Sequence, residues 1–294
     1  MLLAEIKNIY HNELVELYPK TEIDSFFYST IEHFLQLERF ALVIQPQLTL
    51  TKSEEQPLFE TLSRLKQEEP LQYILGEIYF MDFKLKVNEH TLIPRPETEE
   101  LISWVLETSQ NKNTIPTTYA NESLKVLDIG TGSGCIAIAL AKALPHAHVT
   151  AIDISNEALQ LAQENARLNT VKVNFVQADI LAITKIEWTE FDIIISNPPY
   201  VRELEKPKMN NNVKLYEPPT ALFVPDTNPL LFYEAIANFA GSALKNEGQL
   251  YLEINQYLGK ETKSLFAAHN FTAIELKKDI FENQRMLRCK KVNK

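Results

Sequence analysis

Residues 125–135 have the sequence Lys-Val-Leu-Asp-Ile-Gly-Thr-Gly-Ser-Gly-Cys, and the apolar residues 136–144 follow them directly. This order predicts a buried strand, a tight glycine loop and a helix, which together start a parallel sheet. Three of the seven glycines of the chain lie in the loop, so the backbone must pass very close to something there. The stretch therefore predicts an α/β fold with a ligand site at the loop.

The spacing of the glycines narrows the ligand. A dinucleotide fingerprint requires a glycine at position 135, where this chain has Cys135, and a phosphate-binding P-loop requires Gly-Lys-Ser/Thr, which is absent. The loop thus fits a nucleotide-like ligand without a pyrophosphate, and S-adenosylmethionine is the obvious candidate. The predicted donor-binding loop consists of Gly130, Thr131, Gly132, Ser133 and Gly134.

Acidic residues end the next two predicted strands. The strand over 148–152 ends in Asp153, with Ser155 placed to cap the following helix, and an acid at this point holds ribose hydroxyls in related folds. The alternative is a surface aspartate near a helix start. The third strand, 173–176, leads into Asp179 and Ile180. We expect Asp179 to accept from the adenine amino group and Ile180 to contribute a backbone N–H and apolar cover.

The fourth strand leads to an acceptor motif. The β-branched run from Phe191 predicts a strand buried on both faces, and it must stop at Asn197-Pro198-Pro199-Tyr200 because proline has no N–H for the sheet. Asn197 offers an amide oxygen and Pro198 a carbonyl oxygen, so together they suit both N–H bonds of a planar NH2 group. Tyr200 offers a flat face for stacking. The alternative is a simple strand-terminating turn, but four such features at four successive strand ends are an improbable coincidence.

The amino-terminal segment has a different character. Residues 1–75 contain no glycine, and their apolar residues recur at helical spacing, as in Phe27, Ile31, Phe34 and Leu35. A capping box is expected at Ser53 and Gln56. The segment has 6 Lys and Arg against 12 Asp and Glu, a balance of −6, which disfavours nucleic acid and favours a protein partner. We expect a helical substrate-recognition domain over 1–75, a β-hairpin linker over 76–94 and the catalytic domain over 95–294.

The remaining segments complete the predicted domain. Thr98 or a neighbour is expected to cap the helix that continues through Leu101, Ile102 and Val105, and residues 107–123 are expected to form a surface loop. The long connection 201–229 carries Arg202, Lys206, Lys208 and Lys214, and a cover over the acceptor site suits its position. A helix over 229–244 and a strand over 249–254 follow. Two closing strands, 271–276 and 285–290, must be antiparallel, which is the layout of class I methyltransferases.

Composition excludes several functions. The net charge of −10 disfavours a protein that works on nucleic acid. Cys135 and Cys289 lie far apart and no histidine pair has metal-ligand spacing, so we expect no metal and a reduced environment. The amino terminus is too polar for a signal peptide, and no apolar run reaches membrane-spanning length. A cytoplasmic protein without a membrane partner is expected.

These motifs together resemble the release factor glutamine methyltransferase family. The resemblance spans essentially the whole chain and rests on residues 94–99 (Pro-Arg-Pro-Glu-Thr-Glu), 128–134, Asp153, the tetrapeptide 197–200 and residues 283–286. It implies a Rossmann-like class I methyltransferase preceded by a small helical domain, with a mostly parallel sheet and an antiparallel last strand. Ile180 stands where some relatives have an aromatic residue.

The resemblance also implies an activity. A monomeric enzyme would transfer a methyl group from S-adenosylmethionine, leaving S-adenosylhomocysteine, to the amide nitrogen of the glutamine in the Gly-Gly-Gln motif of peptide chain release factors. The residues implied in catalysis are Asn197, Pro198 and Tyr200, with Pro199 also contacting the substrate and Asn197 also contacting the donor.

Three alternatives remain at this level. A methyltransferase of exocyclic amino groups in nucleic acids uses the same tetrapeptide, and the basic residues of 201–229 would then line a local groove. A sister family methylates a glutamine of a ribosomal protein. A non-enzymatic S-adenosylmethionine-binding module is the third alternative, but it leaves the acceptor motif unexplained.

Overall fold

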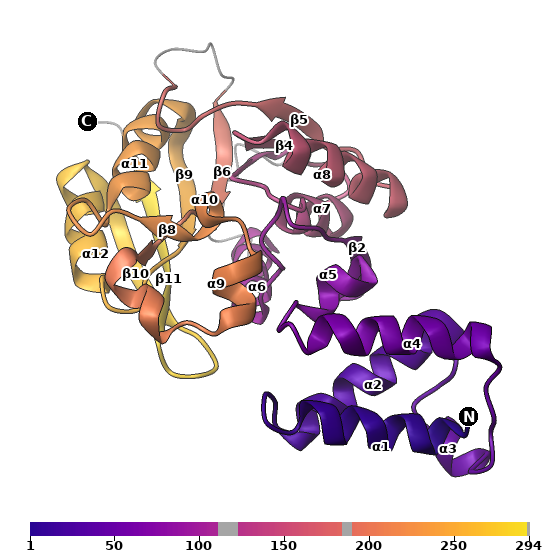
Figure 1. Ribbon diagram of the computed structural model, residues 1–294. Coiled ribbons are helices and arrows are strands. Elements are labelled where there is room, and N and C mark those ends of the chain that lie inside the picture. Colours follow the sequence, from indigo (N-terminus) through magenta and orange to yellow (C-terminus); the bar gives the residue numbers. More distant parts are fainter. Residues whose placement is uncertain (111–122, 184–189, 293–294) are drawn as a thin grey trace. The chain divides into compact units, whose positions relative to one another are not determined.

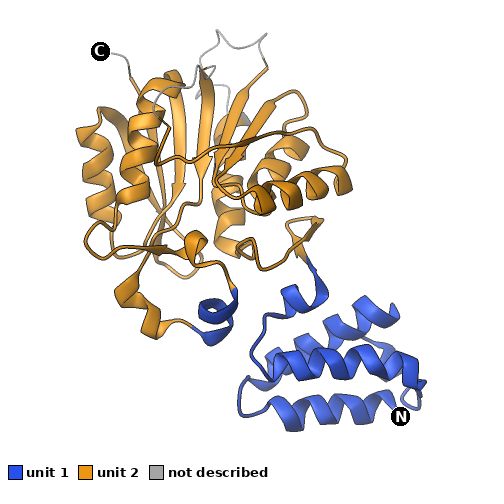
Figure 2. Ribbon diagram, turned by 45° about the horizontal axis from the view of Figure 1, so that its top comes forward, with its two compact units in different colours: residues 1–77, 210–216 blue, residues 78–209, 217–294 orange. Residues whose placement is uncertain are grey.

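The computed structural model describes residues 1–110, 123–183 and 190–292 (Figure 1). Within them the chain divides into two compact units, residues 1–77 with 210–216 and residues 78–209 with 217–294 (Figure 2). Each unit buries an apolar core of its own. The helices predicted over 1–75 lie in the first unit, and nearly all of the predicted hairpin lies in the second.

The first unit is helical. Its elements along the chain are α1 (Leu3–Leu14), α2 (Lys20–Leu35), α3 (Ala41–Ile44), α4 (Lys52–Leu65) and α5 (Leu71–Leu75). Leu3, Ile6 and Tyr10 recur on one side of α1 and are fully buried, as their spacing predicts. The predicted capping box is two residues too late: α4 begins at Lys52, and Thr51 and Glu54 form the box because Thr51 is the residue with extended backbone before the helix.

A segment from far along the sequence completes the first unit. Helix α9 (Asn211–Tyr216) belongs to the long connection 201–229, yet its residues group with the helical unit. Asn211 Nδ2 donates to the Glu68 carboxylate at 2.9 Å, and the Tyr216 hydroxyl donates to the Gln67 carbonyl at 2.7 Å. The connection therefore has its middle in one unit and both its ends in the other.

The second unit is built on a seven-stranded sheet in the order β10-β11-β9-β6-β3-β4-β5. Its strands are β3 (Lys125–Ile129), β4 (His148–Asp153), β5 (Asn174–Gln177), β6 (Phe191–Ser196), β9 (Leu244–Glu253), β10 (Phe271–Lys278) and β11 (Gln284–Lys291). The strands from β5 to β9 are parallel, whereas β11 is antiparallel to both β9 and β10. The predicted sheet, including its antiparallel end, is confirmed. Strand β9 starts at Leu244, five residues before the prediction.

Helices cover both faces of this sheet. They are α6 (Pro96–Gln110), α7 (Cys135–Ala143), α8 (Asn156–Leu168), α11 (Leu231–Ala243) and α12 (Gly259–Ala268). Ile193 and Ile195 belong to one buried cluster, with α6 and α7, while Ile194 belongs to the other, with α11 and α12. Successive side chains of a strand point to opposite faces, so the apolar run of β6 is buried because both faces are covered.

Short elements join these layers. They are the hairpin β1 (Glu77–Phe80) and β2 (Phe83–Lys86), the two-residue strands β7 (Val201–Arg202) and β8 (Phe223–Val224), the 3₁₀ helix η2 (Glu203–Lys208) and α10 (Pro219–Leu222). The expected loop over 107–123 is wrong at its start, because α6 continues to Gln110. Residues 111–122 of that loop lie outside the described residues. Among the described helices, none is both long and apolar enough to cross a membrane.

Candidate active site

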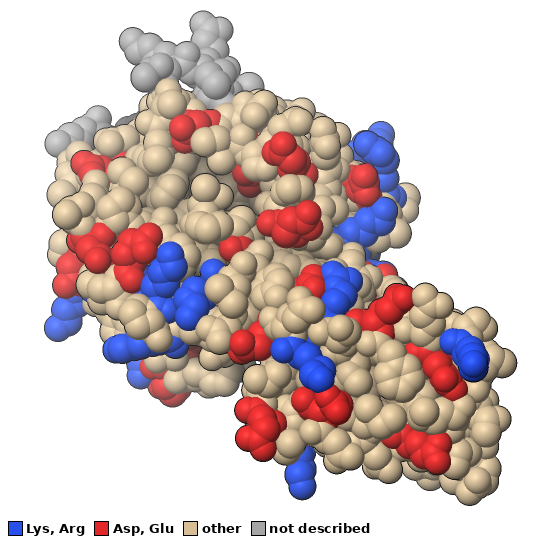
Figure 3. Space-filling view, in the orientation of Figure 1, with Lys and Arg blue, Asp and Glu red and all other residues tan. Residues whose placement is uncertain are grey.

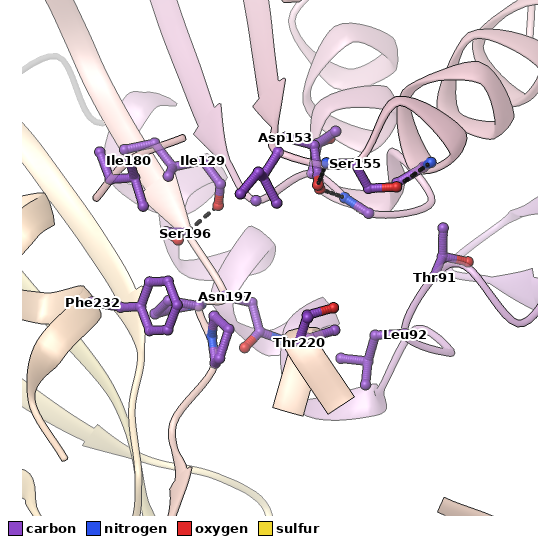
Figure 4. Close-up of a pocket in the computed structure, with 18 of the residues that line it drawn as sticks. Thr91, Leu92, Ile129, Asp153, Ser155, Ile180, Ser196, Asn197, Thr220 and Phe232 are labelled. Atoms are coloured by element: carbon purple, nitrogen blue, oxygen red, sulfur yellow. Dashed lines mark hydrogen bonds between the residues drawn. The ribbon is translucent and has the colours of Figure 1, made fainter. Parts of the chain in front are cut away.

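A cavity of about 410 Å³ lies at the carboxyl ends of β3, β4 and β6 (Figure 4). Its walls include the glycine loop, the residues that follow β4, β5 and β6, the stretch 218–225, and residues of 90–98, Thr98 among them. The chain leaves β3 for β4 on one side and later returns to β6 on the other, so the cavity lies at the reversal of strand order, where α/β sheets bind ligands. Its size falls within the roughly 300–1,000 Å³ typical of small-molecule sites.

The glycine loop has the backbone that only glycine adopts without strain. Gly130, Gly132 and Gly134 have φ angles of 73°, 55° and 84°. A Cβ atom on Gly134 would lie 3.1 Å from both the Ala162 Cβ and the Ile138 Cδ1, so this glycine lets α7 and α8 pack closely. A Cβ atom on Gly130 or Gly132 would meet nothing within 4 Å. Those two glycines therefore leave open space where the predicted donor would lie.

A buried acid near the end of β3 contacts the glycine loop. Asp128 is fully buried, and its Oδ2 accepts from the Thr131 hydroxyl at 2.6 Å. Burial raises the pKa of Asp128 to about 7, because the charged form is poorly solvated there. Thr131 and Ser133 are themselves buried and line the cavity. Asp128 therefore holds the loop in shape.

Asp153 stands at the end of β4, as the sequence predicts, and lines the cavity. Its Oδ2 accepts from the Gly132 N–H at 2.8 Å and its Oδ1 from the Ser155 N–H at 3.0 Å. Figure 4 shows both bonds. Burial raises the pKa of this carboxyl. Ser155 is the N-cap of α8, where its hydroxyl accepts from the Ala158 N–H at 3.0 Å, so the predicted cap is confirmed.

The residues predicted to hold adenine and residues 197–199, which we call the acceptor wall, all line the cavity. Asp179 and Ile180 line the cavity, and Asp179 Oδ1 accepts from the Leu181 N–H at 2.8 Å. Asn197 and the two prolines that follow it also line the cavity. The side chain of Asn197 lies between those of Phe232 and Thr220 in Figure 4. The glycine loop and residues 197–199 thus share one cavity.

Tyr200 is placed differently from the other residues of the tetrapeptide. It is not among the described residues that line the cavity. Its hydroxyl donates to Glu253 Oε1 at 2.7 Å, and the Arg285 guanidinium lies 5.9 Å from the centre of its ring. Burial raises the pKa of the Tyr200 phenol well above its ordinary value. Its predicted stacking on the substrate stays a prediction.

Sequence reasoning missed the anchor of the 218–225 wall. Glu217 is 1% exposed, accepts from the Ile93 N–H at 3.1 Å and pairs with the Arg95 guanidinium. Pro218, next to this anchor, lines the cavity. Two features of the sequence point to this contact: Arg95 lies between two prolines, and Glu217 directly precedes another proline pair.

It also missed two residues behind the acceptor motif. Thr98 does not cap α6, because that helix begins at Pro96; instead its hydroxyl donates to Glu253 Oε2 at 2.8 Å. Glu253 ends strand β9 and is 1% exposed. A lone acid at the end of the apolar run Leu250–Leu252 was the signal available, since such an acid is rarely buried without a partner.

Comparison with known protein families gives two matches. The family model described as the methyltransferase small domain matches residues 113–215, and the PrmC N-terminal domain model matches residues 27–76. A release factor glutamine methyltransferase of Flavobacterium psychrophilum is 49% identical to this chain, over 98% of this chain and 99% of that relative. One from Bacteroides thetaiotaomicron is 37% identical over 93% of this chain and 95% of that relative.

Solved structures agree on the fold. A methyltransferase from Pyrococcus furiosus superposes with a TM-score of 0.50 at 17% identity, covering 83% of this chain and all (100%) of that one. A 16S rRNA methyltransferase of T. thermophilus, solved in complex with AdoMet and guanosine, has a TM-score of 0.51 at 19% identity, covering 73% of this chain and 49% of that one. Both likenesses support the class I methyltransferase fold of the second unit.

Proposed function

Because the chain belongs to the release factor glutamine methyltransferase family, we propose that it methylates the side-chain amide nitrogen of the glutamine in the Gly-Gly-Gln motif of a peptide chain release factor. The observation that carries the proposal is the shared cavity: Asn197, Pro198 and Pro199 line the same space as the glycine loop. The helical unit, with its acidic balance, is the part that we assign to recognition of the protein substrate. We further propose that the enzyme acts as a cytoplasmic monomer.

The cavity suits S-adenosylmethionine. Gly130 and Gly132 leave room for a ligand close to the backbone, and Cys135 stands where a dinucleotide fingerprint has a glycine. We assign the ribose hydroxyls to Asp153 and the adenine edge to Asp179 and Ile180, which all line the cavity. When bound, this donor supplies an electrophilic methyl group on a positively charged sulfur. The remaining chemistry is positioning by the protein.

The acceptor wall supplies that positioning. Among the described residues, neither the Asn197 Oδ1 nor the Pro198 carbonyl accepts a hydrogen bond. These two oxygens can take both N–H bonds of a glutamine amide, which leaves the nitrogen lone pair directed at the methyl carbon. An amide nitrogen is a poor nucleophile because its lone pair is delocalised into the carbonyl. Good orientation is worth as much as ~7–11 kcal/mol of the barrier in favourable systems, so positioning can carry this reaction.

The surface gives less support to a nucleic-acid substrate. Arg202 pairs with Glu205 at 3.2 Å and Lys206 with Glu203 at 3.8 Å, so two of the four basic residues of the connection are neutralised locally. On the face drawn in Figure 3, several Lys and Arg gather in one small patch with Asp and Glu beside it, and elsewhere on this face the two kinds are interspersed over the described residues. Nucleic-acid binding by phosphate contact requires a continuous basic stripe.

The test is a set of parallel labelling assays. The purified enzyme is incubated with methyl-labelled S-adenosylmethionine and, separately, a release factor, the same factor with the Gly-Gly-Gln glutamine changed to alanine, ribosomal proteins and bulk RNA. Label should enter the first sample alone. Label in RNA or in ribosomal proteins, with none in the release factor, would overturn the proposal in favour of one of the alternatives.

Substitution of Asn197 tests the assigned chemistry in the same assay. Asn197→Ala leaves a substrate N–H without its acceptor and should slow single-turnover transfer at saturating donor by at least about tenfold. Asn197→Asp keeps an acceptor oxygen but adds a negative charge. That charge stabilises the positively charged donor before transfer, and the stabilisation fades as transfer removes the positive charge from the sulfur, so the barrier rises. This variant should bind donor at least as well as the unsubstituted enzyme and transfer more slowly. Near-normal transfer by Asn197→Ala would make this residue a turn former only.

A further inference from the structure

A chain of hydrogen bonds links Asn197 and Tyr200 to two buried residues, Thr98 and Glu253. Asn197 Nδ2 donates to Thr98 Oγ1 at 3.2 Å, and the Thr98 hydroxyl donates to Glu253 Oε2 at 2.8 Å. The other oxygen of Glu253 accepts from the Tyr200 hydroxyl at 2.7 Å. Thr98 and Glu253 are 2% and 1% exposed, and Thr98 also lines the cavity. The first and last residues of the acceptor tetrapeptide are thus tied to the same carboxylate.

The direction of each bond follows from the chemistry of the groups. When the carboxyl of Glu253 is ionised it only accepts, and the single hydrogen of the Thr98 hydroxyl is then committed to it. The Thr98 oxygen can then only accept from Asn197, and the group that meets it must be the NH2 rather than the carbonyl oxygen. The amide oxygen of Asn197 is left for the cavity that Asn197 lines. In this orientation the Asn197 oxygen can accept an N–H of the substrate amide. In the flipped orientation the Asn197 NH2 would face the substrate N–H, and two donors cannot form a hydrogen bond.

Thr98 departs from what its own helix does with hydroxyl groups. Further along α6, Ser103 donates to the Glu99 carbonyl at 2.9 Å and Ser109 to the Val105 carbonyl at 2.7 Å, the usual local bond of a hydroxyl in a helix. Thr98 instead donates to a side chain 155 residues away. Burial raises the pKa of Glu253, while the hydroxyls of Tyr200 and Thr98 and the charge of Arg285 oppose that shift. A buried acid costs free energy, and stability alone does not require one here.

We propose that Thr98 and Glu253 are positioning residues that hold the Asn197 side-chain amide in the one orientation able to accept an N–H bond of the substrate amide. The inference rests on the proposed function, because it concerns the acceptor half of that reaction. It gives a physical role to Thr98 of the Pro-Arg-Pro-Glu-Thr-Glu stretch, which the sequence alone suggests as a helix cap. Neither residue lies among those assigned to the ribose or adenine of the donor.

The hydrogen-bonded series Asn197–Thr98–Glu253 forms a relay. Thr98→Val tests this relay, because it keeps the shape of the side chain and removes the hydroxyl. Transfer to a release factor in single turnovers should fall by at least about tenfold, while the Kd for S-adenosylmethionine changes by less than about twofold. Thr98→Ser restores the hydroxyl and should recover most of the rate. The matched control is Thr262→Val in α12, where a fully buried hydroxyl donates only to the Leu258 carbonyl at 2.7 Å. It should lose stability without this selective loss of rate.

A second measurement, of the Asn197 side chain by NMR, does not depend on activity. The carboxamide NH2 signal of Asn197 in a ¹⁵N-resolved spectrum is identified as the one that Asn197→Asp removes. It should shift in Thr98→Val and return toward its original position in Thr98→Ser. If Thr98→Val fails to fold, Glu253→Gln tests the same relay from its other end and should reduce the transfer rate while donor binding persists.

The outcomes separate this inference from the proposed function. If the unsubstituted enzyme labels no release factor, the proposed function fails, and the carboxamide signal still reports whether Thr98 orients Asn197. If the unsubstituted enzyme is active and Thr98→Val transfers within about twofold of it, the relay is wrong. The same conclusion follows if Thr98→Ser stays as slow as Thr98→Val, or if the carboxamide signal does not respond.

Discussion

The carboxylate of Glu217 pairs with the guanidinium of Arg95, although 122 residues separate them in the chain. Glu217 also accepts from the N–H of Ile93, which is buried. The pair joins the stretch before α6 to the stretch that walls the cavity at 218–225. The pair of Glu217 with Arg95, which itself lines the cavity, thus anchors one wall.

Glu217→Ala should therefore affect both stability and donor binding. It leaves the Ile93 N–H unsatisfied and Arg95 unpaired, so the free energy of unfolding should fall by about 1–3 kcal/mol. We expect the Kd for S-adenosylmethionine to rise, because the 218–225 wall loses its anchor. Urea denaturation and calorimetry measure the two effects. Glu203→Ala, which removes a half-exposed ion pair from the same connection, is the control and should change stability by less than about 1 kcal/mol. Equal behaviour of the two variants would show that Glu217 anchors nothing.

Asp153→Ala tests the donor assignment. Removing this carboxylate takes the acceptor from the Gly132 N–H and from the predicted ribose hydroxyls, and should cost about 1–3 kcal/mol of donor affinity. The measurement is calorimetric titration with S-adenosylmethionine. Glu164→Ala on α8, which removes an exposed carboxylate paired with Lys86, should bind donor normally. Donor affinity in Asp153→Ala equal to that of the unsubstituted enzyme would remove Asp153 from the ribose site.

Two glycine substitutions should act in opposite directions. Gly134→Ala puts a Cβ atom 3.1 Å from Ala162 and Ile138 at a φ of 84°, so it should lower stability by about 1–3 kcal/mol. Gly241→Ala lies within α11 and its Cβ meets nothing within 4 Å, so it should raise stability by about 0.5–1 kcal/mol through helix propensity. Thermal and urea unfolding of both variants check the pair. A stabilised Gly134→Ala would mean that α7 and α8 have room to separate.

Asp128 should make stability depend on pH. Its pKa is raised from 3.8 to about 7 by burial, so between those values the folded protein keeps a proton that the unfolded chain has lost. Folding then binds a proton, and the free energy of unfolding falls as pH rises, by at most about 1.4 kcal/mol per pH unit. Asp128→Asn cannot ionise and should lack this contribution. Urea denaturation of both proteins at pH 5, 6 and 7 gives the comparison. Stability curves that run parallel would show that Asp128 does not titrate in this range.

Much of the fold follows from local patterns in the sequence. The apolar run of β6, the glycines at 130–134 and the cap at Ser155 each act within one or two turns of chain, and the structure has all three as predicted. The placement of Asp153 and Asn197 at strand ends also follows, because the carboxyl ends of parallel strands meet at one edge of the sheet. Sequence alone therefore predicts that the glycine loop and Asn197 share one cavity, and both line it.

Other features depend on contacts that no local pattern encodes. Thr98 has a cap-like position near the start of α6, and only the approach of β9 turns its hydroxyl toward Glu253. The connection 201–229 looks like a single loop in the sequence, yet α9 groups with the first, helical unit and Glu217 with the second unit. Hydrophobic periodicity specifies which face of an element is buried, but the polar partner met there depends on how distant elements pack. The orientation of Asn197 is for this reason decided by tertiary structure, since Thr98 lies 99 residues from Asn197 along the chain and Glu253 lies 155 residues from Thr98.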